Sequence, residues 1–368
     1  MVVVGGGVVG CATAYFLARD GYSVTLIERD AIASHASGFA YGGLSPIMGL
    51  IEDDPVLSLS EAADAIHTEL AQRLPAESGV EYEYRRKTSL TLACSRIEVD
   101  ELRRAYDWLK QHYDGEVAWH DEGSVRAVEP RVGPSVIAGL FADRASEVEP
   151  YRFTLALWQA AERSGAVMRN VTMTGVVRKG GNVCGVRLES GEEIMTGALV
   201  LAAGPWMGKA TEWLGIDIPI SPLKGQILRL RAPGEPLAVS LSWSHNYATT
   251  KPDGLVWCGT TEEHVGFDET PTPYGRDTIM ASIVEVLPYM ADAELVQQTA
   301  CLRPIAPDGL PVIGPAPGNA GVFIASGSGR KGIFLGPAMG RTIAEMVAGK
   351  EPAVDVSGLS PGRFASIR

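Results

Sequence analysis

The chain opens on an apolar run that glycines interrupt and that then resumes with helical spacing. Residues 2–4 are predicted as a buried strand, and residues 8–19 as a helix that ends at Gly21. Residues 22–27 alternate and are partly β-branched, which predicts the next strand. The order of strand, glycine turn, helix and strand is a βαβ unit of the dinucleotide-binding kind.

The remaining apolar and polar positions predict further helices and strands. Helical spacing is found at residues 57–74, 98–112, 278–287 and 333–348. Strand patterns are found at residues 82–93, 198–203, 223–260 and 322–325, and at residues 167–188, which form a predicted hairpin around Gly180 to Asn182. We therefore expect one α/β domain built from separated segments, with a second, mostly antiparallel domain inserted between them.

Length, composition and charge exclude several classes of protein. The 368 residues exceed what one small core holds, and 46% hydrophobic with 21% charged residues is ordinary for a globular protein. The net charge of −12 disfavours a nucleic-acid binder, which needs a basic face. The five cysteines form no CxxC pair, so they predict neither a zinc site nor a disulfide framework, and they fit a reducing, cytoplasmic compartment. Six scattered histidines give no reason to expect a metal.

Residues 1–18 carry no charged side chain and could be mistaken for a signal peptide or a membrane span. A basic segment before the apolar run is absent, and three consecutive glycines interrupt it. A span needs about 20 mostly apolar residues. We therefore predict no transmembrane segment.

The glycine turn matches GxGxxG at Gly5, Gly7 and Gly10. Gly5 allows the tight turn, Gly7 lets the backbone approach a pyrophosphate, and Gly10 lets the helix pack close to the strand. Glu28 ends the second strand, where its carboxylate can bind both ribose hydroxyls and would repel the 2′-phosphate of NADP. The motif predicts a dinucleotide but does not distinguish FAD from NAD.

Several further segments give the chain a more specific resemblance. Over essentially its whole length it resembles the FAD-dependent amino-acid oxidases and dehydrogenases of the D-amino-acid oxidase superfamily, and especially glycine oxidases and D-amino-acid dehydrogenases. The segments that carry the resemblance are the small-residue loop 36–44, the stretch 147–151, the strand and turn 199–206, Leu302-Arg303-Pro304 with the following 307–314, and the glycine-rich turn 327–333. Segments 302–304 and 307–314 together are the most diagnostic.

This resemblance implies a fold that combines α/β with antiparallel β structure. A Rossmann-type FAD-binding domain would be assembled from residues 1–75, 148–215 and 300–368, and a substrate domain from residues 76–147 and 216–299. Together with the motif residues, the cofactor-binding positions that we expect are Gly5, Gly7, Val8, Val9, Gly10, Glu28, Arg29, Ala36, Ser37, Tyr41, Gly42, Gly43, Thr174, Gly204, Ser328, Gly329, Arg330, Lys331, Gly332 and Ile333.

The turn at residues 327–332 also has a physical interpretation of its own. It opens a second helix, whose positive N-terminal end would stabilise the negative charge of a reduced flavin. A plain surface loop before the last helix is the alternative.

The resemblance also implies the residues that bind the substrate. Arg303 would hold the substrate carboxylate through two parallel hydrogen bonds, Arg330 would lie beside it, and the Tyr247 hydroxyl would bind the same carboxylate. Each has a structural alternative: an ion pair for the arginines, and packing for the tyrosine. Cys301 directly precedes Leu302, and a thioether to the flavin competes with a role as a small buried hydrophobe.

The implied reaction is oxidative deamination of a small amino acid: glycine, a D-amino acid or an N-methyl amino acid. A hydride would pass from the substrate Cα to flavin N5, and the resulting imine would hydrolyse to a 2-oxo acid. The electron acceptor would be O₂; alternatively, a dehydrogenase, which could be membrane-peripheral, would use a quinone or another carrier. An NAD-dependent dehydrogenase or a non-catalytic flavin subunit also remains open. Substrate size depends on side chains near Tyr41, Met48 and Tyr247, and the oligomeric state, monomer or homo-oligomer, is not readable from the sequence.

Overall fold

The computed structural model describes residues 1–45, 55–113 and 115–364. Met48 therefore lies outside the described residues. The helices are α1 (Val8–Arg19), α2 (Ala36–Phe39), α3 (Leu57–Ser78), α4 (Arg96–His112), α5 (Glu122–Val128), α6 (Pro150–Arg163), α7 (Ala210–Leu214), α8 (Pro273–Val286) and α9 (Gly332–Val347). None of the helices in these residues combines the length and the apolar composition that crossing a bilayer requires.

The strands divide into three sheets within the described residues. The six-stranded sheet has the order β17 (Val312–Pro315), β18 (Val322–Ser326), β11 (Leu199–Leu201), β1 (Val2–Val4), β2 (Thr25–Glu28) and β7 (Val167–Asn170). Its strands are parallel except for β17, which runs antiparallel to β18. β8 (Met173–Lys179), β9 (Asn182–Leu188) and β10 (Glu193–Met195) form a small antiparallel sheet.

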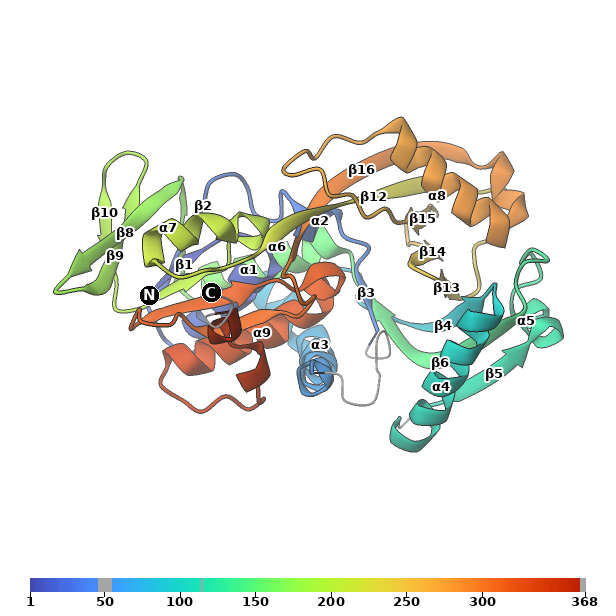
Figure 1. Cartoon of the computed structure of the whole chain (residues 1–368), viewed down its shortest axis with the longest axis horizontal. Coiled ribbons are helices and arrows are strands. Elements are labelled where there is room, and N and C mark those ends of the chain that lie inside the picture. The colour runs from blue at the N-terminus through green and yellow to red at the C-terminus, as the bar shows by residue number, and fades with distance from the viewer. Residues whose placement is uncertain (46–54, 114, 365–368) are drawn as a thin grey trace.

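The nine-stranded sheet is mostly antiparallel and contains β16 (Glu294–Ile305), β12 (Ser221–Arg231), β15 (Val256–Gly259), β14 (Asn246–Thr250), β13 (Ser240–Trp243), β4 (Arg85–Ala93), β6 (Ala138–Glu147) and β3 (Gly43–Leu44), with β5 (Val117–Asp121) paired to β6. Figure 1 shows the long strands β12 and β16 running from the helices around the six-stranded sheet to the far end of the molecule. The predicted fold class, α/β with an inserted mostly antiparallel sheet, is confirmed. The exact domain boundaries remain a prediction.

The central strands of the six-stranded sheet are buried on both faces, as a parallel sheet requires. Val2, Val3 and Val4 are all buried. Val3 shares a core with apolar side chains of α1, α6 and α9, whereas Val2 and Val4 belong to the core on the other face of the sheet. Apolar residues of the nine-stranded sheet instead pack against α8, whose N-terminus is fixed by the Thr272 hydroxyl accepting from the Gly275 N–H at 3.1 Å. The nine-stranded sheet therefore has a core of its own, whereas the three-stranded sheet shares one with the six-stranded sheet.

The predicted secondary structure needs three corrections. The strand expected over residues 22–27 is β2, which begins at Thr25. The stretch 167–188 is a hairpin only from Met173 onward, because its first part, β7, pairs parallel to β2 in another sheet. The predicted helix 278–287 begins earlier, at Pro273, since a proline at the first helical position extends α8 toward its N-terminus.

Candidate active site

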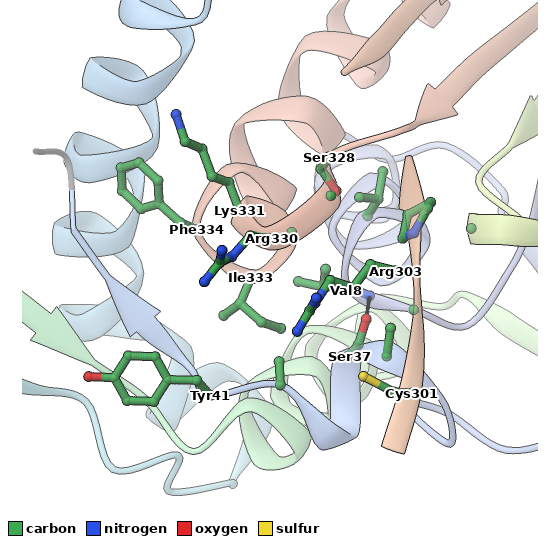
Figure 2. A pocket seen from close by; sticks show the side chains of 18 of the residues that line it. Val8, Ser37, Tyr41, Cys301, Arg303, Ser328, Arg330, Lys331, Ile333 and Phe334 are labelled. Carbon is green, nitrogen blue, oxygen red and sulfur yellow. Dashed lines mark hydrogen bonds between the residues drawn. The ribbon is translucent and has the colours of Figure 1, made fainter. Parts of the chain in front are cut away.

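A cavity of about 1110 Å³ is lined by residues from both the six-stranded and the nine-stranded sheet. Its wall includes the first glycine turn, residues 5–9, and the last glycine turn with the start of α9, residues 328–334. It also includes Tyr41, Tyr247, Cys301 and Arg303. Figure 2 shows the start of α9, Ser37 and Arg303 around this space. The two glycine turns, more than 300 residues apart in sequence, therefore face one cavity.

The first turn has the close contacts that its glycines permit. Gly5 has a φ of +113°, and a Cβ there would lie 2.3 Å from the Ala202 carbonyl oxygen. A Cβ at Gly10 would lie 1.9 Å from the Gly5 carbonyl oxygen, so a larger residue would push α1 away from β1. These contacts explain why the turn needs glycine at both positions.

Two backbone N–H groups of this turn donate to side-chain oxygens. The Val8 N–H, at the start of α1, donates to the Ser37 hydroxyl at 2.9 Å, and the Gly6 N–H donates to Glu28 Oε2 at 2.6 Å. The other oxygen of Glu28 accepts from the Asp30 N–H at 2.8 Å. Glu28 is thereby held facing the cavity, and the positive end of α1 points at the same place.

The last turn brings α9 against α1. A Cβ at Gly336 would lie 2.8 Å from Val8 Cγ1, and a Cβ at Gly340 would lie 2.7 Å from Ala12 Cβ. Glycine at these two positions, one helical turn apart, therefore lets the helices approach closely. As a result both helices begin at the cavity, each with its positive N-terminal end.

His67, on α3, stabilises the first turn of α9. Its Nε2 lies 2.9 Å from the Phe334 carbonyl oxygen and 3.2 Å from that of Ile333, so Nε2 carries the hydrogen. The Ile333 carbonyl needs this donor because residue 337 is a proline, which has no N–H to donate four residues on. Burial lowers the pKa of His67 to about 4, so the ring is neutral at pH 7.

Arg303 extends from β16 over a glycine on the neighbouring strand. A Cβ at Gly225 of β12 would lie 2.0 Å from Arg303 Nη2, so the guanidinium lies directly over that glycine. Its Nη1 donates to the Thr261 carbonyl oxygen at 3.1 Å, and its Nη2 donates to the Thr260 hydroxyl. The guanidinium is thus fixed against the sheet at the cavity wall.

Tyr247 is a half-buried tyrosine whose hydroxyl oxygen is buried and has no hydrogen-bond partner among the described residues. Its ring stacks on that of Tyr41, with ring centroids 4.2 Å apart and an angle of 17° between the planes. Burial raises its pKa well above the usual value, although Arg303 opposes this shift, so the hydroxyl keeps its proton. A buried hydroxyl without a partner costs free energy, which marks it as a group available to a ligand.

Arg330 lies in the last glycine turn, close to Arg303. Its Nη2 donates to the His245 carbonyl oxygen, and its Nη1 lies 3.3 Å from Glu262 Oε1. Burial, and then the neighbouring charge of Arg303, lower the pKa of Arg330. Figure 2 shows the guanidinium ends of Arg303 and Arg330 directed toward the middle of the pocket. We refer to these two residues as the arginine pair.

Cys301 is buried at the cavity wall, two residues before Arg303 on β16. Burial raises the pKa of its thiol, with Arg303 acting in the opposite direction. The sulfur is therefore a neutral thiol, which is the less nucleophilic form. The thioether to a flavin remains a prediction.

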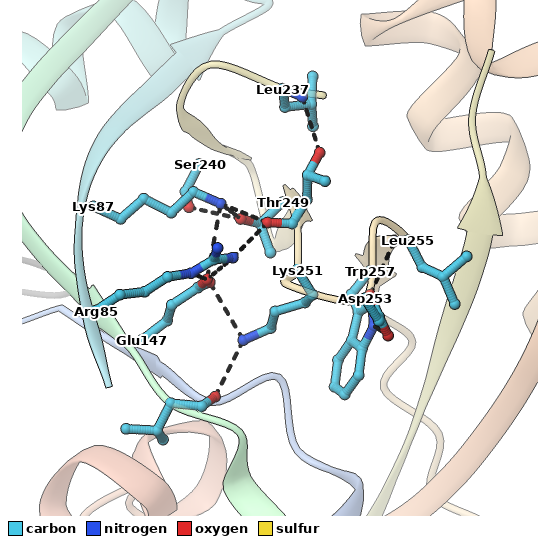
Figure 3. Close-up of polar contacts among 12 residues, drawn as sticks. Arg85, Lys87, Glu147, Leu237, Ser240, Thr249, Lys251, Asp253, Leu255 and Trp257 are labelled. Atoms are coloured by element: carbon cyan, nitrogen blue, oxygen red, sulfur yellow. Dashed lines mark hydrogen bonds and ion pairs between the residues drawn. The ribbon is translucent and has the colours of Figure 1, made fainter. Parts of the chain in front are cut away.

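A second group of basic side chains lies near Tyr41, around the buried carboxylate of Glu147 (Figure 3). Arg85 donates to Glu147 Oε1, Lys251 Nζ lies 3.3 Å from Oε2, and Lys87 Nζ lies 3.9 Å from Oε1. The same cations donate to backbone oxygens: Arg85 and Lys87 to Thr250, and Lys251 to Val148. We call Arg85, Lys87, Glu147 and Lys251 the Glu147 cluster.

Most of the positions expected to bind the cofactor line the cavity. These are Gly5, Gly7, Val8, Val9, Glu28, Arg29, Ala36, Ser37, Tyr41, Gly43, Gly204, Ser328, Gly329, Arg330, Lys331, Gly332 and Ile333. Gly10 and Gly42 lie behind the wall. Thr174 is exposed on β8 and donates to the Arg187 carbonyl oxygen at 3.3 Å, whereas residues 171–173 just before it line the cavity. The structure thus places Thr174 outside the site.

Sequence reasoning overlooked several residues that shape the site. They are Gly225, Gly259 and Glu262, which surround the arginine pair and Tyr247, and His67, which binds α9. A Cβ at Gly259 would lie 3.0 Å from the Tyr247 hydroxyl oxygen. No local motif announces them, because each acts through a partner far away in sequence.

Known proteins resemble this chain over nearly its whole length. The family model of FAD dependent oxidoreductases, DAO, matches residues 1–346. The glycine oxidase of Pseudomonas aeruginosa is 32% identical over 363 residues, covering 98% of each chain. The D-amino acid dehydrogenase of Methylobacterium nodulans is 27% identical, covering 99% of each. The crystal structure of glycine oxidase from Geobacillus kaustophilus matches with a TM-score of 0.93 at 26% identity, covering 98% of both chains.

Proposed function

Because the chain belongs to the FAD-dependent oxidoreductase family and is an FAD-dependent amino-acid oxidoreductase, we propose that it deaminates a small amino acid with O₂ as electron acceptor. The substrates that we propose are glycine, a D-amino acid or an N-methyl amino acid. The observation that carries this proposal is the Tyr247 hydroxyl, which has no partner in the described part of the chain and lies at the cavity that Arg303 also lines. A carboxylate there would accept hydrogen bonds from both groups.

The residues at the cavity fit FAD. The two helix N-termini would supply N–H groups and positive ends for phosphates and for the negative charge of a reduced flavin, and Glu28, which faces the cavity, would accept from ribose hydroxyls. Ser37 and the first glycine turn leave room for the close approach of a pyrophosphate, since only the Ser37 hydroxyl would meet a Cβ at Gly7, at 3.2 Å. When bound, FAD supplies the two-electron acceptor for the hydride that leaves the substrate Cα.

The side chains of the protein bind and orient the substrate. Arg303 and Tyr247 would hold its carboxylate, and Arg330 would add a second positive charge. The substrate amine must lose its proton, because its lone pair forms the C=N bond as the Cα–H bond breaks. Water then hydrolyses the imine to a 2-oxo acid and ammonia. An N-alkyl substrate would give an alkylamine in place of ammonia. Positioning alone can contribute a large part of the barrier reduction, and no side-chain general base is required.

A dehydrogenase that passes electrons to a quinone or another carrier is the second candidate. The full-length similarity to a D-amino acid dehydrogenase favours it, as do the amino-acid sequences of segments 42–46 and 306–314. The arginine pair and Tyr247 favour the oxidase.

Two linked experiments test the proposal. Anaerobic mixing with glycine, D-amino acids and N-methyl amino acids should bleach the visible flavin band with at least one of them. A stopped-flow experiment should then show rapid reoxidation of the reduced enzyme by O₂. Sluggish reoxidation by O₂ with rapid reoxidation by a quinone would replace the oxidase by the dehydrogenase, and no bleaching by any amino acid would overturn both.

The compartment and the partners follow from the same proposal. All five cysteines are free, which fits a reducing cytoplasmic compartment. The partners would be the amino acid and the electron acceptor. The chain could also form a homo-oligomer, which a measurement of its molecular mass in solution would test.

A further inference from the structure

Glu262 is the acidic side chain nearest to the arginine pair among the described residues. Its Oε1 lies 3.3 Å from Arg330 Nη1 and 4.0 Å from Arg303 Nη1. Its side chain is 41% exposed, so it reaches the pair from the solvent side. One carboxylate therefore already contacts both of the guanidinium groups that we propose to receive the substrate carboxylate.

The backbone around Glu262 is fixed rather than free to swing. The next residue, Glu263, exchanges two backbone hydrogen bonds with Lys224 of β12, of 3.0 and 2.9 Å. The preceding residue, Thr261, accepts from the Gln226 N–H through its hydroxyl at 3.1 Å and from Arg303 through its carbonyl oxygen. The backbone of Glu262 is thereby held in register with β12, so its side chain stays within reach of the arginine pair.

The arginine pair and Glu262 together carry a net charge of +1. Arg303 and Arg330 carry two positive charges, and Glu262 carries one negative charge. Tyr247 adds none, because burial keeps its hydroxyl protonated. Figure 2 shows Lys331 directed away from the two guanidinium groups. One substrate carboxylate therefore completes the balance, whereas a second carboxylate would be repelled by Glu262.

We infer that Glu262 selects the charge class of the substrate, favouring amino acids with one carboxylate over those with two. This inference rests on the proposed function, since it assumes that the arginine pair binds the substrate carboxylate. It adds a specificity-determining residue that does not touch the reacting atoms. Attraction within an exposed pair is modest, so Glu262 can hold the pair in place and still yield to an incoming carboxylate.

The alternative is that Glu262 forms an ordinary surface ion pair. Glu262→Gln separates the two, because glutamine keeps the size of the side chain and removes its charge. Glu294→Gln is the matched control: Glu294 is 69% exposed, pairs with Arg231, and lies nine residues before Arg303 on β16. That distance is roughly 30 Å along a strand, several Debye lengths at physiological salt. The control therefore removes the same charge without changing the field at the arginine pair.

The measurement is the dissociation constant of two dead-end ligands, acetate and malonate, from the change that each produces in the flavin absorption spectrum of the FAD-loaded protein. The inference predicts that Glu262→Gln tightens malonate about tenfold and acetate about threefold, so that the preference for acetate falls by about threefold. Glu294→Gln should leave both constants unchanged.

Two other outcomes have separate meanings. If the wild-type protein binds both ligands and Glu262→Gln leaves their ratio unchanged, the inference about Glu262 is overturned while the proposed function stands. If the wild-type flavin spectrum responds to neither ligand up to high concentration, the proposed carboxylate site fails, and the inference fails with it.

Discussion

The Glu147 cluster and the arginine pair are two groups of cations near the same tyrosine stack, and they differ in the carboxylate that each group contains. Cations of both groups donate to backbone oxygens. In the Glu147 cluster a carboxylate that is only 2% exposed lies among three cations. The arginine pair has one half-exposed carboxylate, and the neighbouring Tyr247 hydroxyl has no partner in the described part of the chain. The first group is closed, and the second is open to a ligand.

This difference shows that positive charge alone does not identify a binding site. Buried cations that find their acceptors inside the protein fix the strands they join, whereas buried donors that lack an acceptor are available to a ligand. By this criterion the substrate carboxylate belongs at the arginine pair. The Glu147 cluster instead holds β4, β6 and the end of β14 together beside Tyr41.

The largest expected effect comes from Arg303→Leu. Removing a charge-assisted, two-pronged anchor should lower kcat/KM by about a thousandfold or more, or about 4 kcal/mol of transition-state stabilisation. The flavin should stay bound, because the substitution changes no residue of the first glycine turn. Steady-state kinetics and the visible spectrum of the purified variant test both halves. Unchanged turnover would remove Arg303 from the site.

Glu147→Gln should act on stability rather than on catalysis. It leaves three cations without their carboxylate, a change that typically costs about 3–5 kcal/mol. We expect a clearly lower thermal midpoint, with the folded fraction still able to bind flavin. The control is Glu192→Gln, which breaks an exposed pair with Arg169 and should leave the thermal midpoint nearly unchanged. Equal stabilities of the two variants would contradict the closed character of the Glu147 cluster.

Tyr247→Phe should act on catalysis rather than on stability. Loss of one hydrogen bond to the substrate should lower kcat/KM by about tenfold, while stability should be unchanged or slightly higher because an unpartnered buried hydroxyl is removed. Since burial raises the pKa of Tyr247, deprotonation of this residue should not contribute to the alkaline limb of the activity profile, which should be the same in both proteins. A large loss of thermal stability would mean that the hydroxyl is a structural group after all.

A pH dependence of stability is expected from Lys87. Burial lowers the pKa of Lys87 from 10.5 to about 8, with Glu147 opposing the shift. Between about pH 8 and pH 10.5 the unfolded chain therefore binds a proton that the folded protein has released, so stability should rise with pH through this window. Thermal midpoints of wild type and Lys87→Met across that range test this. The wild type should gain on the variant as the pH increases, and a constant difference would contradict the expected shift.

Local patterns in the sequence predicted the parts of the fold that local interactions determine. The first βαβ unit and helix α9 were predicted to within a few residues, because the apolar spacing and the bounding glycines lie within each segment. Helix α6 and strand β16 were not predicted. The N-cap of α6, Glu149 followed by Pro150, was a readable signal, whereas β16 is defined by its pairing with β12, some 75 residues away.

The candidate site divides in the same way. The glycine turns and the Leu302-Arg303-Pro304 segment are visible as motifs, and the structure brings them to one cavity. Glu262, Gly225 and His67 are not visible, because their significance depends on which strand or helix end lies opposite them. Thr174 shows that a correctly predicted strand is not sufficient. The residues that reach the cavity are those just before it, and this depends on how the strand is positioned in the fold.

The most direct test of the account is a crystal structure of the FAD-loaded protein grown with acetate. The account predicts that the acetate carboxylate lies within hydrogen-bonding reach of the Arg303 guanidinium and the Tyr247 hydroxyl, with the Glu147 cluster unchanged. Acetate bound among the cations of the Glu147 cluster, or a Tyr247 hydroxyl turned away from an occupied site, would contradict it.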